Sequence, residues 1–315
     1  MLAHPAGGRD QKPEGGYRGD PGCRDNHTGL RFCERPLTVR HIMDAFEATD
    51  TQPAAPPATP EPPGSLARAR ARVGRPFARR PWTFEVAIFA LALVVYQVSR
   101  ALVIGDTATA FNNAWDVVHW EKKSGLFVET HIQEWVLNHL DLTQFLNWFY
   151  MYGHWTITPV FFVWLYRRRR SVYPYVRNAF LAANAIALMV FVAFPVAPPR
   201  LLSSAGLVDT LKQVSDIDLH GGVLSGWFNP YAAVPSMHFG YAFMIGVVGF
   251  ALLSRWPLRI LALCYPAVVF LTITATANHY VIDSVAGGVV IAMGFAAVAA
   301  WIIVRARLGS QAFPR

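Results

Sequence analysis

The segment YVIDSVAGGVVIAMGFAAVAAWIIV, residues 280–304, contains a single charged side chain. A helix needs about 20 largely apolar residues to cross the hydrocarbon core of a bilayer. The segment therefore predicts a transmembrane helix. Its one charge, Asp283, lies near the start, four residues after His279. Ionisable groups close to membrane depth are commonly functional, so the same stretch indicates both the fold and a candidate site.

Five further apolar segments precede this one. The six predicted spans are residues 82–104, 142–166, 172–194, 237–253, 258–276 and 280–304. In lipid each backbone polar group must be paired within its own segment, which predicts helices throughout. Over 315 residues, 53% are hydrophobic and 15% charged, whereas soluble domains carry about 25% charged residues. We therefore expect an all-α polytopic membrane protein, a six-transmembrane-helix bundle, and exclude a cytosolic enzyme.

Residues 107–140 mix large apolar side chains with charged ones. This pattern indicates one or two amphipathic helices that lie at the membrane interface. The apolar members are Trp120, Phe127, Ile132, Trp135 and Leu137, and the charged members are Glu121, Lys122, Glu129 and Glu134.

Arginines indicate the orientation of the bundle. Basic clusters lie at residues 68–80, 167–170, 255–259 and 305–307, all on one side if six spans alternate. By the positive-inside rule both termini are cytoplasmic. The position of the arginine clusters on the cytoplasmic side, together with their attraction to lipid headgroups, explains the net charge of +8. No nucleic-acid partner is therefore expected. We expect an integral membrane protein, of the plasma membrane, in contact with the lipid bilayer.

The first part of the chain has a different composition. Residues 1–80 are polar and rich in Pro, Gly and Arg, which is typical of a disordered cytoplasmic tail. Residues 81–308 form the membrane domain and 309–315 a short cytoplasmic tail. No apolar core follows the first residues, so no signal peptide is expected, and Met43 is a hypothetical alternative start.

The cysteines and histidines of the tail do not predict a metal site. Three cysteines cannot build a disulfide framework. The spacing of the tail's candidate ligands fits no usual zinc pattern. These residues are Cys23, His27, Cys33 and His41. We expect no metal and no cofactor.

Three polar islands lie at the outer ends of predicted spans. They are FPVAPPR at 194–200, VPSMHFG at 234–240 and ANHYVID at 277–283. The topology places all three at one membrane face, the extracytoplasmic one. Side chains suited to chemistry on a phosphate ester therefore converge there: Arg200, Ser236, His238, His279 and Asp283.

The residue types in these islands suit phosphoryl transfer. The spacing of His279 and Asp283 places both on one helix face, and a bonded carboxylate leaves the other imidazole nitrogen as a nucleophile. His238 follows a predicted helix start and serves as general acid and then base. Helix N-termini bind phosphate, and Arg200 adds a bidentate clamp. Ser236 is either a helix cap or a phosphate donor.

These motifs resemble a known family. PSMH (235–238) and HYVID (279–283) resemble the second and third signature motifs of the type 2 phosphatidic acid phosphatase superfamily. APPR (197–200) resembles the branch that contains fungal inositol phosphorylceramide synthase. The resemblance covers residues 82–305. It implies a six-helix bundle and a metal-independent phosphohistidine mechanism with His279 as nucleophile, Asp283 as its partner, His238 as acid and base, and Arg200 on phosphate.

The sequence departs from the superfamily pattern at three positions. Ala193 and Ile273 stand where the pattern has cations, and Leu201 where it has proline. Fewer cations suit a phosphodiester or a partly neutralised headgroup, unless another cation such as Lys212 folds back.

A further motif, YGH at 152–154, also resembles this branch. We assign Tyr152 and His154 as candidate substrate-binding residues, with interfacial anchoring as the alternative. Asn278, beside His279, is a third candidate.

The leading hypothesis is a membrane phosphotransferase that acts on a lipid phosphate ester. It is inositolphosphotransferase-like, with a polyol or a lipid hydroxyl as acceptor. The first alternative is a lipid phosphate phosphatase that uses water. An alternative of another class is a non-catalytic headgroup-binding protein or transporter.

Overall fold

The computed structural model describes residues 23–25, 31–33, 82–102, 107–217 and 231–311. The chain divides into two compact units, residues 1–44 and 45–315. In the first, β1 (Cys23–Asp25) and β2 (Arg31–Cys33) pair antiparallel, with Cys23 opposite Cys33. These strands lie within the predicted disordered tail. The rest of that tail, with Met43, lies outside the described residues.

The described part of the second unit is helical, which confirms the predicted all-α class for the membrane domain. In chain order the elements are α3 (Trp82–Leu102), α4 (Thr107–Ser124), α5 (Glu129–Leu137), α6 (Leu140–Trp148), the π-helix η2 (Phe149–Gly153), α7 (His154–Arg168), α8 (Tyr173–Ala193), the short 3-10 turns η3 (Pro199–Leu201) and η4 (Ser203–Ala205), α9 (Thr210–Ser215), α10 (Met237–Leu252), α11 (Trp256–Ala275) and α12 (Val281–Gln311).

Each predicted span contains helix, but the helices differ in length. Among the described residues, α8, α11 and residues 281–305 of α12 are long and apolar enough to cross a bilayer. These three helices indicate membrane integration. Helix α10 and residues 82–98 of α3 are apolar but shorter. The second predicted span is divided into α6, η2 and α7.

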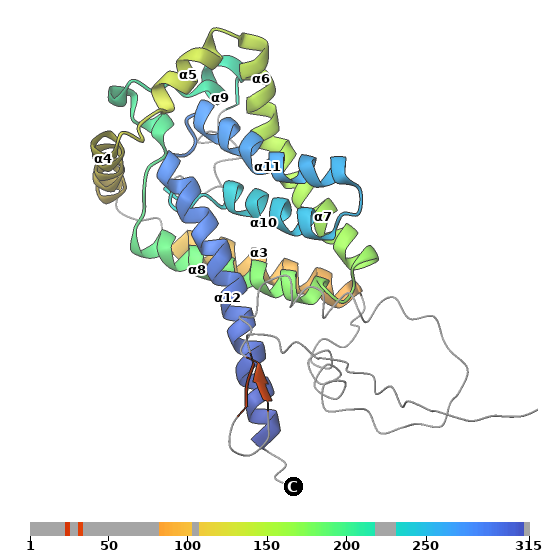
Figure 1. Ribbon diagram of the computed structural model, residues 1–315. Helices are drawn as coiled ribbons and strands as arrows, with labels where there is room; N and C mark the ends of the chain where they lie inside the picture. The colour runs from red at the N-terminus through yellow and green to blue at the C-terminus, as the bar shows by residue number, and fades with distance from the viewer. Residues whose placement is uncertain (1–22, 26–30, 34–81, 103–106, 218–230, 312–315) are drawn as a thin grey trace, which may run out of the picture. The chain divides into compact units, whose positions relative to one another are not determined.

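The centre of the bundle is formed by helices that approach closely at glycines. Helix α12 packs against both α8 and α10, and α10 packs against α11 (Figure 1). A side-chain carbon at Gly294 would lie 2.4 Å from the Ala179 carbonyl oxygen of α8. One at Gly287 would lie 2.1 Å from the Ser236 carbonyl oxygen at the start of α10. Small residues allow such close helix contacts in membrane proteins.

The Gly287 contact gives a testable prediction. Gly287→Ala places a methyl group against backbone that cannot turn aside, so we expect a loss of stability of about 1–3 kcal/mol from overpacking. Gly288→Ala is the matched control, because its nearest neighbour is a Phe239 ring carbon at 3.6 Å. The measurement is thermal unfolding of the purified protein in detergent. Equal melting temperatures for the two variants would contradict the packing.

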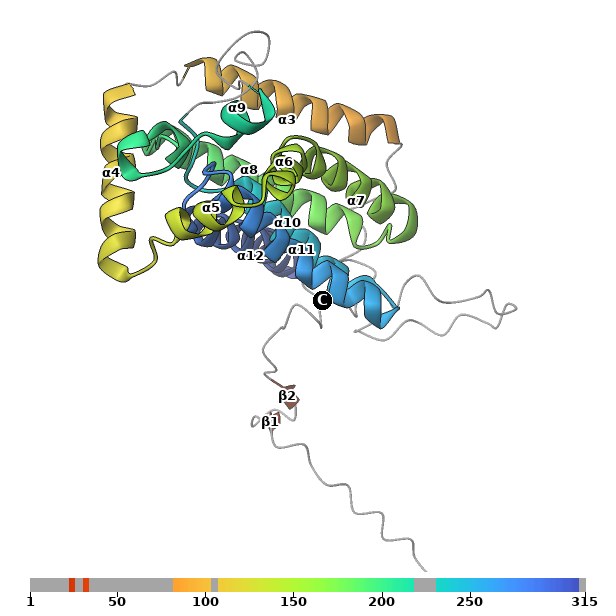
Figure 2. The same ribbon diagram turned by 90° about the horizontal axis from the view of Figure 1, so that it is seen from above.

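Helices α5, α6 and α9 gather near the start of α12. Figure 1 shows α5, α6 and α9 at the end of the bundle where α11 ends and α12 begins, and Figure 2 shows α4 at its edge. Residues 107–140, in which the sequence has an amphipathic pattern, contain helices α4 and α5. However, Glu121 and Glu129 are fully buried, whereas Trp120 and Trp135 are exposed.

A buried ion pair joins α3 to α8. Arg177 donates to both carboxylate oxygens of Glu85, at 2.7 and 2.5 Å, and the Tyr173 hydroxyl donates to the same carboxylate at 3.0 Å. The buried carboxylate of Glu85, in the first predicted span, is therefore paired with an arginine of the third predicted span.

Candidate active site

His279 lies in the short connection between α11 and α12, and its backbone is fixed from both sides. The Ile273 carbonyl accepts hydrogen bonds from the N–H groups of Asn278 and His279, at 2.9 and 3.2 Å. After the histidine, the Asp283 Oδ2 atom accepts from the Tyr280 N–H at 2.9 Å. The carboxylate thus caps the beginning of α12 and holds the turn that carries His279.

Two acceptors fix the His279 ring. Its Nδ1 atom lies 2.9 Å from the Ala233 carbonyl oxygen and 3.3 Å from Asp283 Oδ2. Because a carbonyl oxygen can only accept, we assign the proton to Nδ1 and the lone pair to Nε2. The i, i+4 spacing thus places Asp283 within reach of Nδ1, but the shorter contact is to the backbone.

Burial keeps His279 neutral. The side chain is 7% exposed. Burial lowers the pKa of His279 to about 3, the positive charge of Arg200 acts in the same direction, and the hydrogen bond to Ala233 opposes them. At neutral pH the Nε2 lone pair is therefore available as a nucleophile.

His238 comes from the first turn of α10 and faces this lone pair. Its Nδ1 atom lies 3.4 Å from His279 Nε2. The Ser236 hydroxyl caps α10 by accepting from the Phe239 N–H at 3.4 Å. The Ser236 N–H donates to the Asp283 carbonyl oxygen at 2.9 Å. The starts of α10 and α12 are thus joined directly, and Ser236 acts at least as a cap.

Arg200 is tied to the same connection. Its N–H donates to the Ala277 carbonyl oxygen at 2.8 Å, and its guanidinium donates to Asn278 Oδ1. Asn278 in turn donates to the Thr276 hydroxyl at 2.8 Å. Guanidinium Nε lies 3.8 Å from an Asp209 oxygen. That nitrogen is buried without a hydrogen-bond partner. Burial lowers the pKa of Arg200, but an arginine remains charged.

A third histidine lies next to the pair. The His154 ring, at the start of α7, lies 4.7 Å from the His238 ring between centroids and stacks on Tyr241 at 5.2 Å. Its Nδ1 atom is buried without a hydrogen-bond partner. Tyr152, in contrast, is exposed and stacks on Trp148. Of these two candidates, the structure brings only His154 to the histidine pair.

A comparison with protein families bears on these residues. A family model described as the PAP2 superfamily matches residues 115–297. The chain belongs to this superfamily. Membership indicates a lipid phosphatase or phosphotransferase kind of activity, a lipid phosphate substrate and a membrane setting. No curated protein and no solved structure matches the chain. The branch that resembles inositol phosphorylceramide synthase stays a prediction.

Two residues that bear on the departures from the PAP2 pattern have different surroundings. Ile273 is buried and packs with Ala242 and Val269. Lys212 is exposed on α9. Within the described ranges, no group of three or more His, Cys, Asp or Glu side chains is placed to hold a metal ion.

Sequence reasoning missed two aromatic residues of this PAP2 site. Tyr150 stacks on the His238 ring at 4.7 Å between centroids, and Tyr241 stacks on His154. Tyr241 also donates its hydroxyl proton to Asn184 on α8. The sequence signals that indicate these two residues are helical spacings. Tyr150 precedes His154 by four residues, and Tyr241 follows His238 by three. The histidines thus lie among aromatic rings that restrict their rotation.

Proposed function

We propose that this member of the PAP2 superfamily is an integral membrane enzyme that transfers a phosphoryl group from a lipid phosphate ester through a phosphohistidine on His279. The observation that carries the proposal is the pairing of two buried imidazoles, with Nε2 of His279 3.4 Å from Nδ1 of His238. The fixed tautomer of His279 and the nearby guanidinium of Arg200 support the assignment of nucleophile and phosphate ligand.

In the first step, His279 Nε2 attacks phosphorus and the bond from phosphorus to the ester oxygen breaks. The imidazolium form of His238, favoured by the negative charge of the bound phosphate, gives its Nδ1 proton to the departing oxygen, so the alcohol leaves neutral and His238 becomes a neutral base. A reacting nitrogen and phosphorus stand about 3–3.5 Å apart before attack. The two nitrogens are themselves 3.4 Å apart, so the substrate must move the His238 ring aside as it enters.

In the second step, His238 takes the proton of the acceptor hydroxyl. The acceptor oxygen attacks the phosphohistidine, the bond between nitrogen and phosphorus breaks, and the lone pair returns to His279 Nε2. The donors that stabilise charge on the phosphoryl oxygens are Arg200 and the N–H groups at the start of α10. No step of this scheme needs a metal ion.

The acceptor decides between transfer and hydrolysis. We favour an inositolphosphotransferase-like reaction, in which a polyol or lipid hydroxyl is the acceptor, because of the APPR motif. The apolar residues Ala193 and Ile273 at positions where the superfamily pattern has cations also suit a substrate with less charge than a phosphate monoester. Hydrolysis by the same route, with water as acceptor, is the alternative.

The setting of the site is part of the proposal. We propose that all six predicted spans cross the membrane, with α6, η2 and α7 forming one crossing. The arginine clusters then lie in the cytoplasm with both termini. The histidine pair faces the extracytoplasmic side of the plasma membrane.

The direct test is an assay of the purified protein in mixed micelles. A panel of lipid phosphates is supplied with and without inositol or other alcohols, and both free phosphate and lipid products are followed. We expect turnover that survives EDTA. Product formation that depends on an added alcohol identifies transfer, and free phosphate identifies hydrolysis. Absence of turnover on every member would favour a headgroup-binding protein or transporter.

Arg200 gives a second prediction. Arg200→Lys keeps the charge but removes the forked guanidinium, so we expect loss of one charge-assisted hydrogen bond, about 1.5–3 kcal/mol. This corresponds to a fall of about 10- to 100-fold in kcat/KM. The control is Arg168→Lys, at an exposed position on α7. Steady-state kinetics of the two variants test the assignment, and equal rates would remove Arg200 from the phosphate site.

A further inference from the structure

Two glutamates from the interfacial helices reach the start of α12. Glu121, on α4, accepts a hydrogen bond from the Ile282 N–H through Oε1 at 2.8 Å. Glu129, on α5, accepts from the Val281 N–H through Oε1 at 2.9 Å. Both side chains are 0% exposed. Two buried carboxyl groups distant in sequence thus cap adjacent backbone groups of one helix.

With Asp283, three consecutive N–H groups are bound by carboxyl groups. Asp283 accepts from Tyr280, Glu129 from Val281 and Glu121 from Ile282. Acidic groups are favourable at a helix N-terminus, and the first N–H groups of a helix need partners. One carboxylate is enough for the dipole, however, and three buried ones repel each other. Helix capping alone does not explain the arrangement.

The two glutamates each have a second carboxyl oxygen that is buried away from solvent. The second oxygens, Oε2, of both carboxyl groups are buried and accept no hydrogen bond from another described group. Burial, and then the influence of the neighbouring Glu129, raise the pKa of Glu121 to about 9. Asp283 adds a smaller effect in the same direction. At neutral pH Glu121 therefore keeps its proton.

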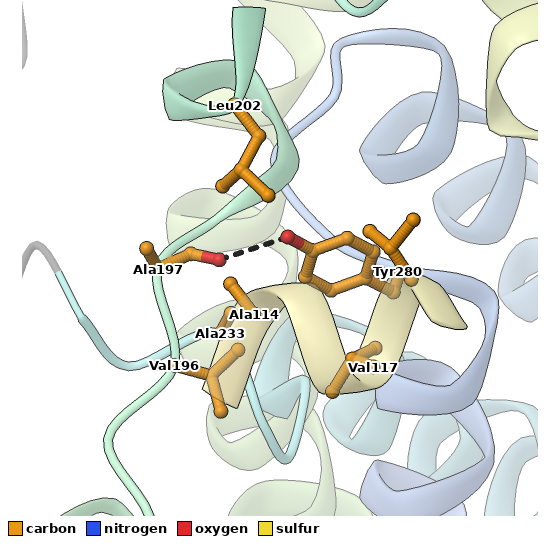
Figure 3. Packing of buried hydrophobic residues seen from close by; sticks show 8 residues of the cluster. Ala114, Val117, Val196, Ala197, Leu202, Ala233 and Tyr280 are labelled. Carbon is orange, nitrogen blue, oxygen red and sulfur yellow. Dashed lines mark hydrogen bonds between the residues drawn. The ribbon is translucent and has the colours of Figure 1, made fainter. Parts of the chain in front are cut away.

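Helix α4 is anchored to the same segment by packing. The Tyr280 ring lies against Ala114 and Val117 of α4, and its hydroxyl donates to the Ala197 carbonyl oxygen at 3.1 Å (Figure 3). Ala197 begins the APPR motif that ends at Arg200. The glutamates are therefore part of a rigid contact between the interfacial helices, the phosphate-binding segment and the turn that carries His279.

We propose that Glu121 and Glu129 are positioning residues for the His279 nucleophile, acting as a carboxyl clamp on the first turn of α12. The proposal rests on the proposed function of His279. The two clamped N–H groups lie between His279 and Asp283 in the chain. Movement of this turn would change the Nδ1–Asp283 contact and the direction in which Nε2 points.

The test compares glutamine with alanine at each position. Glutamine keeps an oxygen that accepts the backbone N–H, and it matches a protonated Glu121. We expect Glu121→Gln to keep kcat within about threefold of wild type. Glu121→Ala and Glu129→Ala should lower kcat by about 30-fold or more with little change in KM, because the substrate is still bound by other groups. These factors are order-of-magnitude expectations for a misaligned nucleophile. Glu134→Gln, at an exposed position on α5, is the control.

The pH profile separates clamping from general destabilisation. Above about pH 9, Glu121 loses its proton and becomes a buried anion next to Glu129, so wild-type kcat should fall. Glu121→Gln cannot ionise and should keep its kcat to higher pH. An unchanged alkaline limb in Glu121→Gln, or equal losses in the glutamine and alanine variants at position 121, would overturn the proposal.

A readout without turnover keeps this inference separate from the proposed function. Hydrogen–deuterium exchange of the peptide around residues 277–285 reports directly on the clamped N–H groups. We expect protection in wild type and Glu121→Gln, and faster exchange in both alanine variants. Unchanged protection in the alanine variants would overturn the clamp even if the enzyme is active. Faster exchange in a protein that shows no turnover on any lipid would support the clamp and count against the function.

Discussion

His279→Ala should abolish turnover, lowering kcat/KM by roughly 10⁴-fold or more, as expected when a nucleophile is removed. The reason is structural as well as chemical. The ring holds its proton on Nδ1 through the Ala233 carbonyl, which leaves the Nε2 lone pair 3.4 Å from His238 Nδ1. The measurement is steady-state release of phosphate or lipid product.

The control for this variant is another histidine. His131→Ala removes an exposed imidazole from α5 and should leave kcat/KM within experimental error. Thermal unfolding in detergent checks that His279→Ala remains folded. Turnover within tenfold of wild type in folded His279→Ala would show that the nucleophile is elsewhere.

His238→Ala should have the second largest effect, and its size should depend on the leaving group. With an alkyl ester, loss of the general acid should lower kcat by roughly 10²- to 10⁴-fold. With a p-nitrophenyl ester the rate of the first step should change little, because nitrophenolate leaves without protonation. The second step still lacks its base. We therefore expect a burst of about one nitrophenolate per protein, followed by slow turnover.

Stopped-flow absorbance measures this burst. Wild type retains the base for the second step, so it should show no comparable burst of nitrophenolate. A loss that is the same for alkyl and nitrophenyl esters, with no burst, would mean that His238 is not the proton donor. In that case His154, whose ring lies 4.7 Å from His238, becomes the group to test.

Much of the fold follows from hydropathy alone, since long apolar segments must be helical in lipid. A helix occupies each of the six predicted segments. The π-helix at Phe149–Gly153 cannot be predicted from hydropathy, because the sequence stays apolar and aromatic across it. It is here that Tyr152 turns outward and His154 inward, so neighbouring residues of one motif have different surroundings. A π-helix depends on packing that periodicity does not encode.

The candidate site likewise has features that the sequence predicts and features that it does not. The pairing of His238 with His279 follows from topology, which brings the ends of distant spans to one face. The Ala233 carbonyl could not be predicted, because it is a backbone group of a loop. Glu121 and Glu129 were expected simply as charged members of an amphipathic pattern. Their burial depends on the N–H groups of a helix more than 150 residues away in sequence.

The most direct test of the central claim is to locate the covalent intermediate. Wild type, His238→Ala and His279→Ala are mixed with a phosphate ester substrate, quenched in alkali to preserve phosphohistidine, digested and analysed by tandem mass spectrometry. We predict a phosphoryl adduct on His279 that accumulates in His238→Ala and is absent from His279→Ala. An adduct on Ser236 or another residue, or turnover in wild type without any adduct in His238→Ala, would contradict the account.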